Sequence, residues 1–391
     1  MNQSADNSPL ATPEPNDAEP AAAKSSSNRR EFLTGMGAIK AIRENAQAQL
    51  DAVDAAWNAA GNDVTGVWEQ YSKTAMACEF EISFNMHQYP KASPTTMLAF
   101  QLVDDLEDQL TIYREHSEVS QLNQLATETP QAVDPGLASL LRLAQEITRD
   151  TGGAFDVTSG QLSQLWGFES RNGAVPAEDK IAAALELVGS NFLVFDEAQQ
   201  KLSISRPGVK INLGGIGKGY ALDRVADLFA AHSIYDFVIH GGQSSVLARG
   251  GSGEQVADQP PEQRCWRVGI SHPTAAGVRL AEVQLRNQAL GTSGTARQGF
   301  FYRGKRYGHI IDPRTGWPTN HFLSTTVVSD SAAVSDAMAT AFFVMKPAEV
   351  FALCDQRPEL KVVLVEGVSR SSGRVKVTTL NFDEAEIEVF E

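Results

Sequence analysis

The sequence predicts an α+β protein with a mixed, largely antiparallel sheet and flanking helices. From residue 69 onward, short strand-like and helical segments follow one another, and strand-like segments dominate the second half of the chain. The chain has 391 residues, of which 42% are hydrophobic and 21% charged. These values are typical of a soluble globular protein with a sizeable core, and they exclude a fibrous or wholly disordered chain.

Helices are predicted where apolar residues recur three and four positions apart. Residues 95–110 and 137–148 show this spacing, residues 218–232 follow a glycine-rich turn, and residues 332–345 carry the strongest helical pattern. Strands are predicted where apolar and polar residues alternate or where short apolar runs end in turns. These segments are 79–84, 210–213, 237–240, 266–270, 281–285, 307–311, 324–328, 362–365 and 375–380, with a hairpin over 192–204 and a surface insertion over 250–263.

The chain is expected to divide into three parts. Residues 1–28, rich in Ala, Pro, Ser and acidic side chains, predict a disordered tail. Residues 29–68 predict a helical segment that opens with a twin-arginine-like motif, but charged side chains interrupt its apolar stretch. We therefore favour an amphipathic helix over residues 34–57, and a cytoplasmic location over export. Residues 69–391 form the predicted globular domain.

The composition narrows the choice of partners. Thirty-three Lys and Arg against 48 Asp and Glu leave a net charge of −15 without any basic run, so no nucleic-acid partner is expected. No stretch reaches the roughly 18 apolar residues of a membrane-spanning helix. Three scattered cysteines exclude a disulfide framework and a thiolate zinc site. A phosphate-bearing ligand would therefore need local cations, helix N-termini or a metal ion.

Residues 212–220, Asn-Leu-Gly-Gly-Ile-Gly-Lys-Gly-Tyr, form a glycine turn between a predicted strand and a predicted helix. The turn matches neither a Walker loop nor a Rossmann fingerprint. Its glycines still allow backbone amides to approach an anion, the start of the helix carries positive partial charge, and Lys218 adds a full charge. The sequence leaves two interpretations open: a phosphate-binding turn or a tight strand-to-helix corner.

Two further clusters carry chemistry-bearing side chains. Asp336 and Thr340 are four residues apart on a predicted helix, so their oxygens share a face and suit Mg²⁺; a polar helix face or an N-terminal cap is the alternative. His309 could accept a proton, Asp312 could orient it or bind the metal, and Arg314 could face a phosphate. A structural turn with a surface ion pair is the alternative for this second cluster.

Six segments, read in order, resemble the ApbE family of FAD:protein FMN transferases. The resemblance extends over about residues 71–345, and its closest matches are TGGAFDVT with LWGF and HIIDPRTG. The segments are residues 75–80, 113–123, 151–158 with 165–168, 213–223, 309–316, and the helix that carries Asp336 and Thr340.

The resemblance implies a mixed α/β body of two lobes around an FAD cleft, with Mg²⁺ on the pyrophosphate. It implies transfer of FMN from FAD to a Ser or Thr hydroxyl of a target flavoprotein, with release of AMP; some members hydrolyse FAD instead. The implied metal ligands are Asp336, Thr340 and the backbone carbonyl of Gly217. The expected catalytic residues are His309, Lys218 and Asp312, and the expected FAD contacts are Met76, Tyr113, Phe155, Asp156, Gly214, Gly215, Lys218, Asp223, Ser293, His309 and Arg314.

Some positions depart from the family pattern. Asn212 stands where Asp is common, Gly217 replaces Ala, and Gln243 falls in a GGQSS segment that replaces a GGD type. The family's acceptor motif, Asp-x-x-[Ser/Thr]-Gly-Ala-Thr, does not occur in this chain, so the acceptor is expected to be a separate flavoprotein subunit. An FAD pyrophosphatase and a non-catalytic FAD-binding protein remain the alternatives.

Overall fold

The computed structural model describes residues 68–85, 88–170, 172–252, 264–295, 299–368 and 374–390. All of them belong to one unit of the chain, Ala56–Glu391. The predicted tail at residues 1–28, the predicted helix at residues 34–57 and residues 253–263 of the predicted insertion lie outside the described residues.

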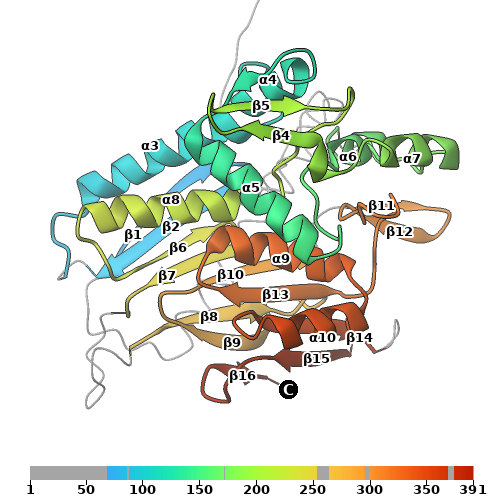
Figure 1. Cartoon of the computed structure of the whole chain (residues 1–391). Helices are drawn as coiled ribbons and strands as arrows, with labels where there is room; N and C mark the ends of the chain where they lie inside the picture. The colour runs from blue at the N-terminus through green and yellow to red at the C-terminus, as the bar shows by residue number, and fades with distance from the viewer. Residues whose placement is uncertain are drawn as a thin grey trace, which may run out of the picture. The chain divides into compact units, whose positions relative to one another are not determined.

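An eight-stranded sheet forms the centre of the described fold, in the order β1-β2-β6-β7-β10-β13-β14-β15 (Figure 1). All of its paired neighbours run antiparallel. The predicted α+β class with a largely antiparallel sheet is therefore confirmed. The strands are β1 (Trp68–Ala75), β2 (Cys78–Asn85), β6 (Phe237–Gly241), β7 (Ser245–Arg249), β10 (Ala289–Gly294), β13 (Ser324–Ser329), β14 (Lys361–Gly367) and β15 (Val375–Leu380).

Helices cover one face of this sheet and bury the main core against it (Figure 1). The four principal helices are α3 (Ser93–Leu110), α5 (Pro135–Asp150), α8 (Gly217–Ala231) and α9 (Ala332–Val344), which confirms the four predicted helices to within two residues at each end. Helix α9 packs on β10 and β13 and is buried on nearly all sides. Such burial explains why its sequence is apolar almost throughout.

The opposite face of the sheet packs against a second, three-stranded sheet. Its strands are β8 (Trp266–Ser271), β9 (Arg279–Leu285) and β16 (Ile387–Val389), in the order β16-β9-β8. Inward residues such as Val268 and Val283 meet Val246 and Val363 of the large sheet. No helix among the described residues is long and apolar enough to cross a membrane.

Smaller elements complete the helical side of the fold. They are α4 (Glu118–Leu125), β3 (Gln131–Ala132), α6 (Gly160–Leu165), α7 (Glu178–Leu185), a 3₁₀ turn (Ser190–Phe192), β4 (Leu193–Asp196), β5 (Lys201–Ile204), β11 (Gly299–Tyr302), β12 (Lys305–Gly308) and α10 (Pro347–Gln356). β4 and β5 form the hairpin predicted over residues 192–204.

A cluster of aromatic rings joins the β11–β12 hairpin to the segment after α6. Trp166 is fully buried and contacts the rings of Phe168, Phe300, Tyr307 and Trp317. Its indole Nε1 donates a hydrogen bond to the carbonyl of Gly316 at 2.9 Å. This cluster fixes the hairpin and the 309–316 turn to the same support.

One predicted strand, at residues 210–213, is wrong, and another, at residues 307–311, is too long. Residues 210–213 form only one isolated bridge, from Lys210 to Ser159, because the amide side chain of Asn123 pairs with both the N–H and the carbonyl of Ile211 in place of a neighbouring strand. The strand predicted over 307–311 ends with β12 at Gly308. Beyond it, Ile311 bridges Pro318 across a tight turn instead of continuing the hairpin.

Candidate functional site

The carboxylate of Asp336 joins α9 to the start of α8. The backbone N–H of Gly219 donates to its Oδ2 at 2.8 Å, and the hydroxyl of Ser245, on β7, donates to both oxygens at 2.7 and 2.9 Å. Gly219 lies in the first turn of α8, where unpaired N–H groups and positive partial charge favour a carboxylate. Residues 117 positions apart in sequence therefore meet at one group.

The environment of this carboxylate acts on its charge in opposing ways. Burial, the strongest influence, raises the pKa of Asp336 above its ordinary value. The charge of Lys218 and the hydrogen bonds from Ser245 and Gly219 act to lower the pKa. A cation bound here would favour the ionised carboxylate that burial disfavours.

Thr340 lies one helical turn beyond Asp336, at the point where α9 meets both β10 and the glycine turn. Its hydroxyl is 3.0 Å from the hydroxyl of Ser293 and donates to the carbonyl of Asp336 at 3.1 Å. A Cβ added to Gly215 would lie 3.5 Å from Thr340 Oγ1 and 3.1 Å from the ring of Phe155. The glycine at position 215 thus allows the turn to approach Thr340 and Phe155 closely.

Asp223 positions α9 from the other side of the same helix pair. Its two carboxylate oxygens accept hydrogen bonds from the Ser331 hydroxyl at 2.7 Å and from the backbone N–H groups of Ala332 and Ala333 at 2.9 and 3.0 Å. These donors form the N-terminus of α9, so Asp223 caps that helix. The carboxylate of Asp223 thus has a structural role as a helix cap. The expected contact between Asp223 and FAD stays a prediction.

Replacing Asp223 by Ala is expected to lower the free energy of unfolding by about 2 kcal/mol, the upper range for a lost helix cap, because three donors lose their acceptor. Urea denaturation followed by circular dichroism measures this change. Asp227→Ala is the matched control on the same helix, since its exposed ion pair with Arg224 contributes at most about 1 kcal/mol. Equal stability of the two variants would contradict the capping role.

The end of α3 brings two other predicted residues, Met76 and Tyr113, near the glycine turn. Glu107 accepts a hydrogen bond from the backbone N–H of Met76 at 2.8 Å and a second from Arg114, the neighbour of Tyr113, at 3.3 Å. Leu110 lies in the last turn of α3 and Gly217 is the first residue of α8. A Cβ added to Gly217 would be 3.8 Å from the Leu110 side chain, so the two helices are in contact here. The Met76 turn and the Tyr113 loop therefore lie at the end of α3 that contacts the glycine turn.

Met76 and Tyr113 are suited to different contacts. Met76 has a φ of 48° and Ala77 a φ of 58°, a left-handed pair that turns β1 into β2. Non-glycine residues rarely adopt this conformation, and such strain concentrates at ligand sites. The Tyr113 side chain is 72% exposed, so its ring is accessible to a ligand.

Three expected site residues, Asp312, Arg314 and Asp156, have local partners, and their expected roles stay predictions. Asp312 is buried and accepts two hydrogen bonds from the guanidinium of Arg314, at 2.9 and 3.0 Å, which is the ion pair expected of a structural turn. Asp156 accepts hydrogen bonds from the hydroxyl of Thr158 and from the N–H of Ser190, so it joins its loop to the 3₁₀ turn at Ser190–Phe192. Neither the catalytic role of Asp312 nor the phosphate contact of Arg314 is part of the reaction proposed below.

His309 and Gly214 differ in how far they are exposed. His309 is half-buried and directly follows β12, whereas Gly214 is exposed at the tip of the glycine turn. Asn212 accepts a hydrogen bond from the N–H of Gly214 at 2.9 Å and so shapes this tip.

The donor set around Asp336 fits a hard divalent cation. Thr340 and Ser293 add neutral oxygens beside one carboxylate, and the described residues hold no cluster of three or more His, Cys, Asp or Glu side chains. Mg²⁺ suits such a site, because it is commonly bound by one or two carboxylates and completed by water and substrate phosphate. A thiolate or multi-histidine metal site does not fit these residues.

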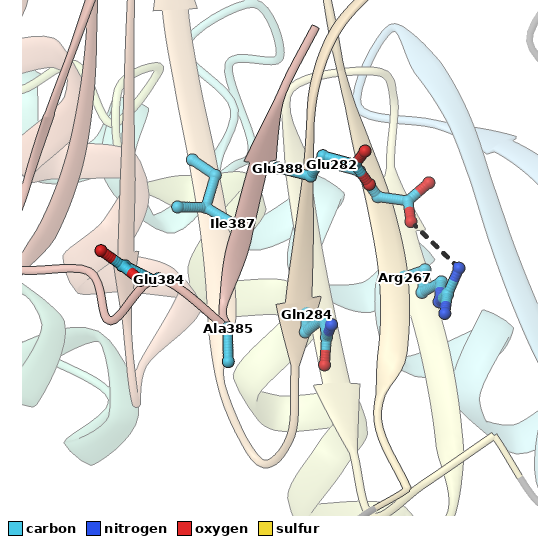
Figure 2. Close-up of a pocket in the computed structure, with 7 residues that line it drawn as sticks. All are labelled: Arg267, Glu282, Gln284, Glu384, Ala385, Ile387 and Glu388. Atoms are coloured by element: carbon cyan, nitrogen blue, oxygen red, sulfur yellow. Dashed lines mark ion pairs between the residues drawn. The ribbon is translucent and has the colours of Figure 1, made fainter.

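A separate hollow of about 320 Å³ lies on the outer face of the three-stranded sheet (Figure 2). Its charged lining consists of Arg267 and three glutamates, Glu282, Glu384 and Glu388. This sheet packs on the face of the large sheet opposite the helices, and the excess of carboxylates disfavours a phosphate-bearing ligand. The hollow shares no residue with the cluster at Asp336.

Sequence reasoning missed Ser245, the residue that donates to both oxygens of Asp336. Ser245 is fully buried, and its side chain makes both of these contacts from β7. The only available signal was the GGQSS segment, which departs from the pattern of the resembling family. A serine two residues after Gln243 could not be distinguished from an ordinary strand residue without the tertiary contact.

Comparison with known proteins identifies the relatives of this chain. Residues 76–364 match the ApbE family. The chain is 31% identical over 252 residues to the FAD:protein FMN transferase of Haemophilus influenzae, a match that covers 62% of this chain and 70% of that protein. It is 32% identical over 268 residues to the FAD:protein FMN transferase of Vibrio cholerae, with coverage of 67% and 77%.

Solved structures of ApbE proteins also resemble this chain in fold. The flavin transferase ApbE from Vibrio cholerae superposes with a TM-score of 0.68 at 27% identity, covering 81% of this chain and 97% of that chain. The ApbE protein from Thermotoga maritima superposes with a TM-score of 0.69 at 26% identity, covering 79% and 96%.

Proposed function

The chain belongs to the ApbE family, and we propose that it transfers FMN from FAD to a Ser or Thr hydroxyl of a separate flavoprotein in a Mg²⁺-dependent reaction that releases AMP. One observation supports this proposal above all. The glycine turn and α9 meet at a buried carboxylate and a threonine hydroxyl, through the Gly219–Asp336 hydrogen bond and the close approach of Gly215 to Thr340.

The reaction exchanges one phosphorus–oxygen bond for another. The acceptor hydroxyl oxygen forms a bond to the phosphorus of the FMN half, and the anhydride bond to the AMP half breaks. AMP leaves with the bridging oxygen, and the hydroxyl proton passes to a base. His309, half-buried after β12, is the proposed base because its ordinary pKa lies near neutrality.

The residues around the glycine turn account for binding of the diphosphate. Asp336, Thr340 and the carbonyl of Gly217 would hold Mg²⁺, which when bound neutralises the diphosphate and stabilises the leaving phosphate. The N-terminus of α8 directs backbone N–H groups and positive partial charge toward an anion. Lys218, whose charge already acts on Asp336, adds a full positive charge at the same place.

The remaining expected contacts suit an extended dinucleotide. Phe155 lies at the Thr340 end of the turn, and Met76 and Tyr113 lie beside the end of α3 that contacts Gly217. A ligand that crosses the turn would therefore have its diphosphate near Lys218 and apolar or aromatic side chains on either side. This arrangement matches a molecule with a ring system at each end of a diphosphate.

The test uses the full chain, FAD, Mg²⁺ and a recombinant flavoprotein domain that carries the Asp-x-x-[Ser/Thr]-Gly-Ala-Thr sequence. Intact-mass spectrometry is expected to show the domain gaining the mass of one FMN with loss of water, with one AMP released per label. Replacing the acceptor residue of the domain by Ala is the matched control and should remove the label.

Other products would identify the alternatives. Free FMN and AMP in equal amounts, without labelled acceptor, would mean that water is the nucleophile and that the protein is an FAD pyrophosphatase. Tight FAD binding without any product in the presence of Mg²⁺ would mean a non-catalytic FAD-binding protein. Either result would overturn the transferase proposal.

A further inference from the structure

The β11–β12 hairpin forms a sheet of its own, seen below α6 and α7 in Figure 1. Its two strands pair with each other, and no other described strand pairs with them. Arg303 and Gly304, with φ values of 49° and 76°, form its two-residue turn. Such a two-stranded ribbon is marginally stable alone, so it depends on the packing of one face.

The hairpin is packed near its base and exposed around its turn. Phe300 and Tyr307 contact Trp166 with their rings, and Gly173 lies so close to Phe300 that a Cβ at position 173 would be 2.1 Å from the ring. Toward the turn, Phe301, on the opposite face from Phe300, is 74% exposed, and Tyr302, on the same face as Phe300 but beyond it, is 43% exposed. Large aromatic side chains that a fold leaves in solvent beside a reaction site are typical of interaction surfaces.

The hairpin carries a net positive charge, whereas the chain as a whole is negative. Residues 299–308 contain Arg303, Lys305 and Arg306 and no acidic residue, in a chain whose net charge is −15. Arg303 and Lys305 are exposed and make no ion pair with any described residue; they lie over the rings of Tyr302 and Tyr307. A positive surface of this kind favours an acidic partner.

Contacts at its base place the hairpin next to the cluster at Asp336. The guanidinium of Arg306 donates to the carbonyl of Thr295, two residues beyond Ser293. Ser293 is itself 3.0 Å from the hydroxyl of Thr340, and His309 directly follows β12. A protein held at the exposed end of the hairpin would therefore contact Lys305, on the same strand that leads into His309, the proposed base.

We propose that the exposed end of the β11–β12 hairpin, formed by Phe301, Tyr302, Arg303 and Lys305, is the docking surface for the acceptor flavoprotein, and that it binds an acidic segment beside the acceptor hydroxyl. This inference rests on the proposed function. The open edges of the ribbon allow an extended acceptor segment to add as a further strand, while the two cations select acidic side chains.

The test measures transfer kinetics with the same recombinant acceptor domain in wild type and in an Arg303→Glu/Lys305→Glu variant. The KM for the acceptor is expected to rise on the order of tenfold or more, because reversed charges repel an acidic segment. The dissociation constant of FAD should stay within about twofold of the wild-type value. Phe301→Ser should raise the acceptor KM without changing its dependence on salt, which distinguishes the aromatic contact from the charged one.

A charge-matched control separates a local effect from a global one. Lys91→Glu/Arg267→Glu changes two exposed cations outside the hairpin by the same total charge and should leave the acceptor KM unchanged. Thermal melting checks that all variants fold, which is expected because the replaced side chains are exposed.

Distinct results would overturn the docking surface and the proposed function. If wild type labels the acceptor but the Arg303→Glu/Lys305→Glu variant keeps the same acceptor KM, the docking inference is wrong. It is also wrong if the variant loses FAD affinity, or if sedimentation shows that the hairpin binds a second copy of this chain. If wild type labels no acceptor while binding FAD and Mg²⁺, the transferase proposal itself fails.

Discussion

Asp336→Asn is expected to reduce Mg²⁺-dependent turnover of FAD on the order of 10³-fold. The amide keeps the size of the side chain and an oxygen that can accept from Gly219 and Ser245, but it removes the negative charge that would hold the cation. Stabilisation of phosphate charge by a bound cation contributes several kcal/mol to such a reaction, which corresponds to about this factor. Release of AMP, followed by chromatography, measures the loss.

Asp330→Asn provides the control for that substitution. Asp330 is an exposed acid just before α9, and its replacement removes the same charge from the same region. The FAD turnover of the Asp330→Asn variant, and the dependence of that turnover on Mg²⁺ concentration, should remain those of wild type. Activity of Asp336→Asn near the wild-type level would mean that the cation, if one is used, binds elsewhere.

Gly219→Ala is expected to disrupt both the stability of the fold and the proposed site. The added methyl group would lie 2.1 Å from the carbonyl oxygen of Ala332 and 2.7 Å from the nitrogen of Ala333. Because these are backbone atoms, α8 and α9 would have to move apart. We expect a loss of about 3 kcal/mol in the free energy of unfolding, together with loss of turnover in the folded fraction.

The matched control for this change is Gly308→Ala, where an added Cβ meets no atom within 4 Å. Denaturation in urea compares the two variants, and Mg²⁺-dependent FAD turnover is then measured at a temperature where both are folded. A Gly219→Ala protein as stable and as active as Gly308→Ala would show that the close crossing of α8 and α9 is unimportant.

Local patterns in the sequence were sufficient to predict the principal helices and most strands. The amphipathic spacing over residues 95–110 and 137–148 and the apolar pattern over residues 332–345 correspond to α3, α5 and α9. Strands β1, β7 and β10 of the central sheet were not predicted. The two predicted strands that are wrong or too long have a common physical cause, since a side chain or a turn outside the local pattern ended the strand in each. Asn123 took the place of a strand next to Ile211, and the turn that begins after Gly308 ended β12.

The candidate site could be predicted only in part. Four-residue spacing placed Asp336 and Thr340 on one helical face, and both reach the cluster beside the glycine turn. Their meeting with residues 215–219 depends on tertiary packing, so spacing alone could not predict it and the family resemblance was needed. The roles of Ser245 and Asp223 could not be predicted from the sequence, because both depend on contacts between residues 91 or more positions apart.

The most direct measurement of the central claim is anomalous diffraction from crystals grown with FAD and Mn²⁺ in place of Mg²⁺. We expect an anomalous peak for a manganese ion whose ligands are the Asp336 carboxylate, the Thr340 hydroxyl and the diphosphate of FAD. A peak located instead at Glu282, Glu384 and Glu388 on the outer sheet, or FAD bound without a metal at Asp336, would contradict it.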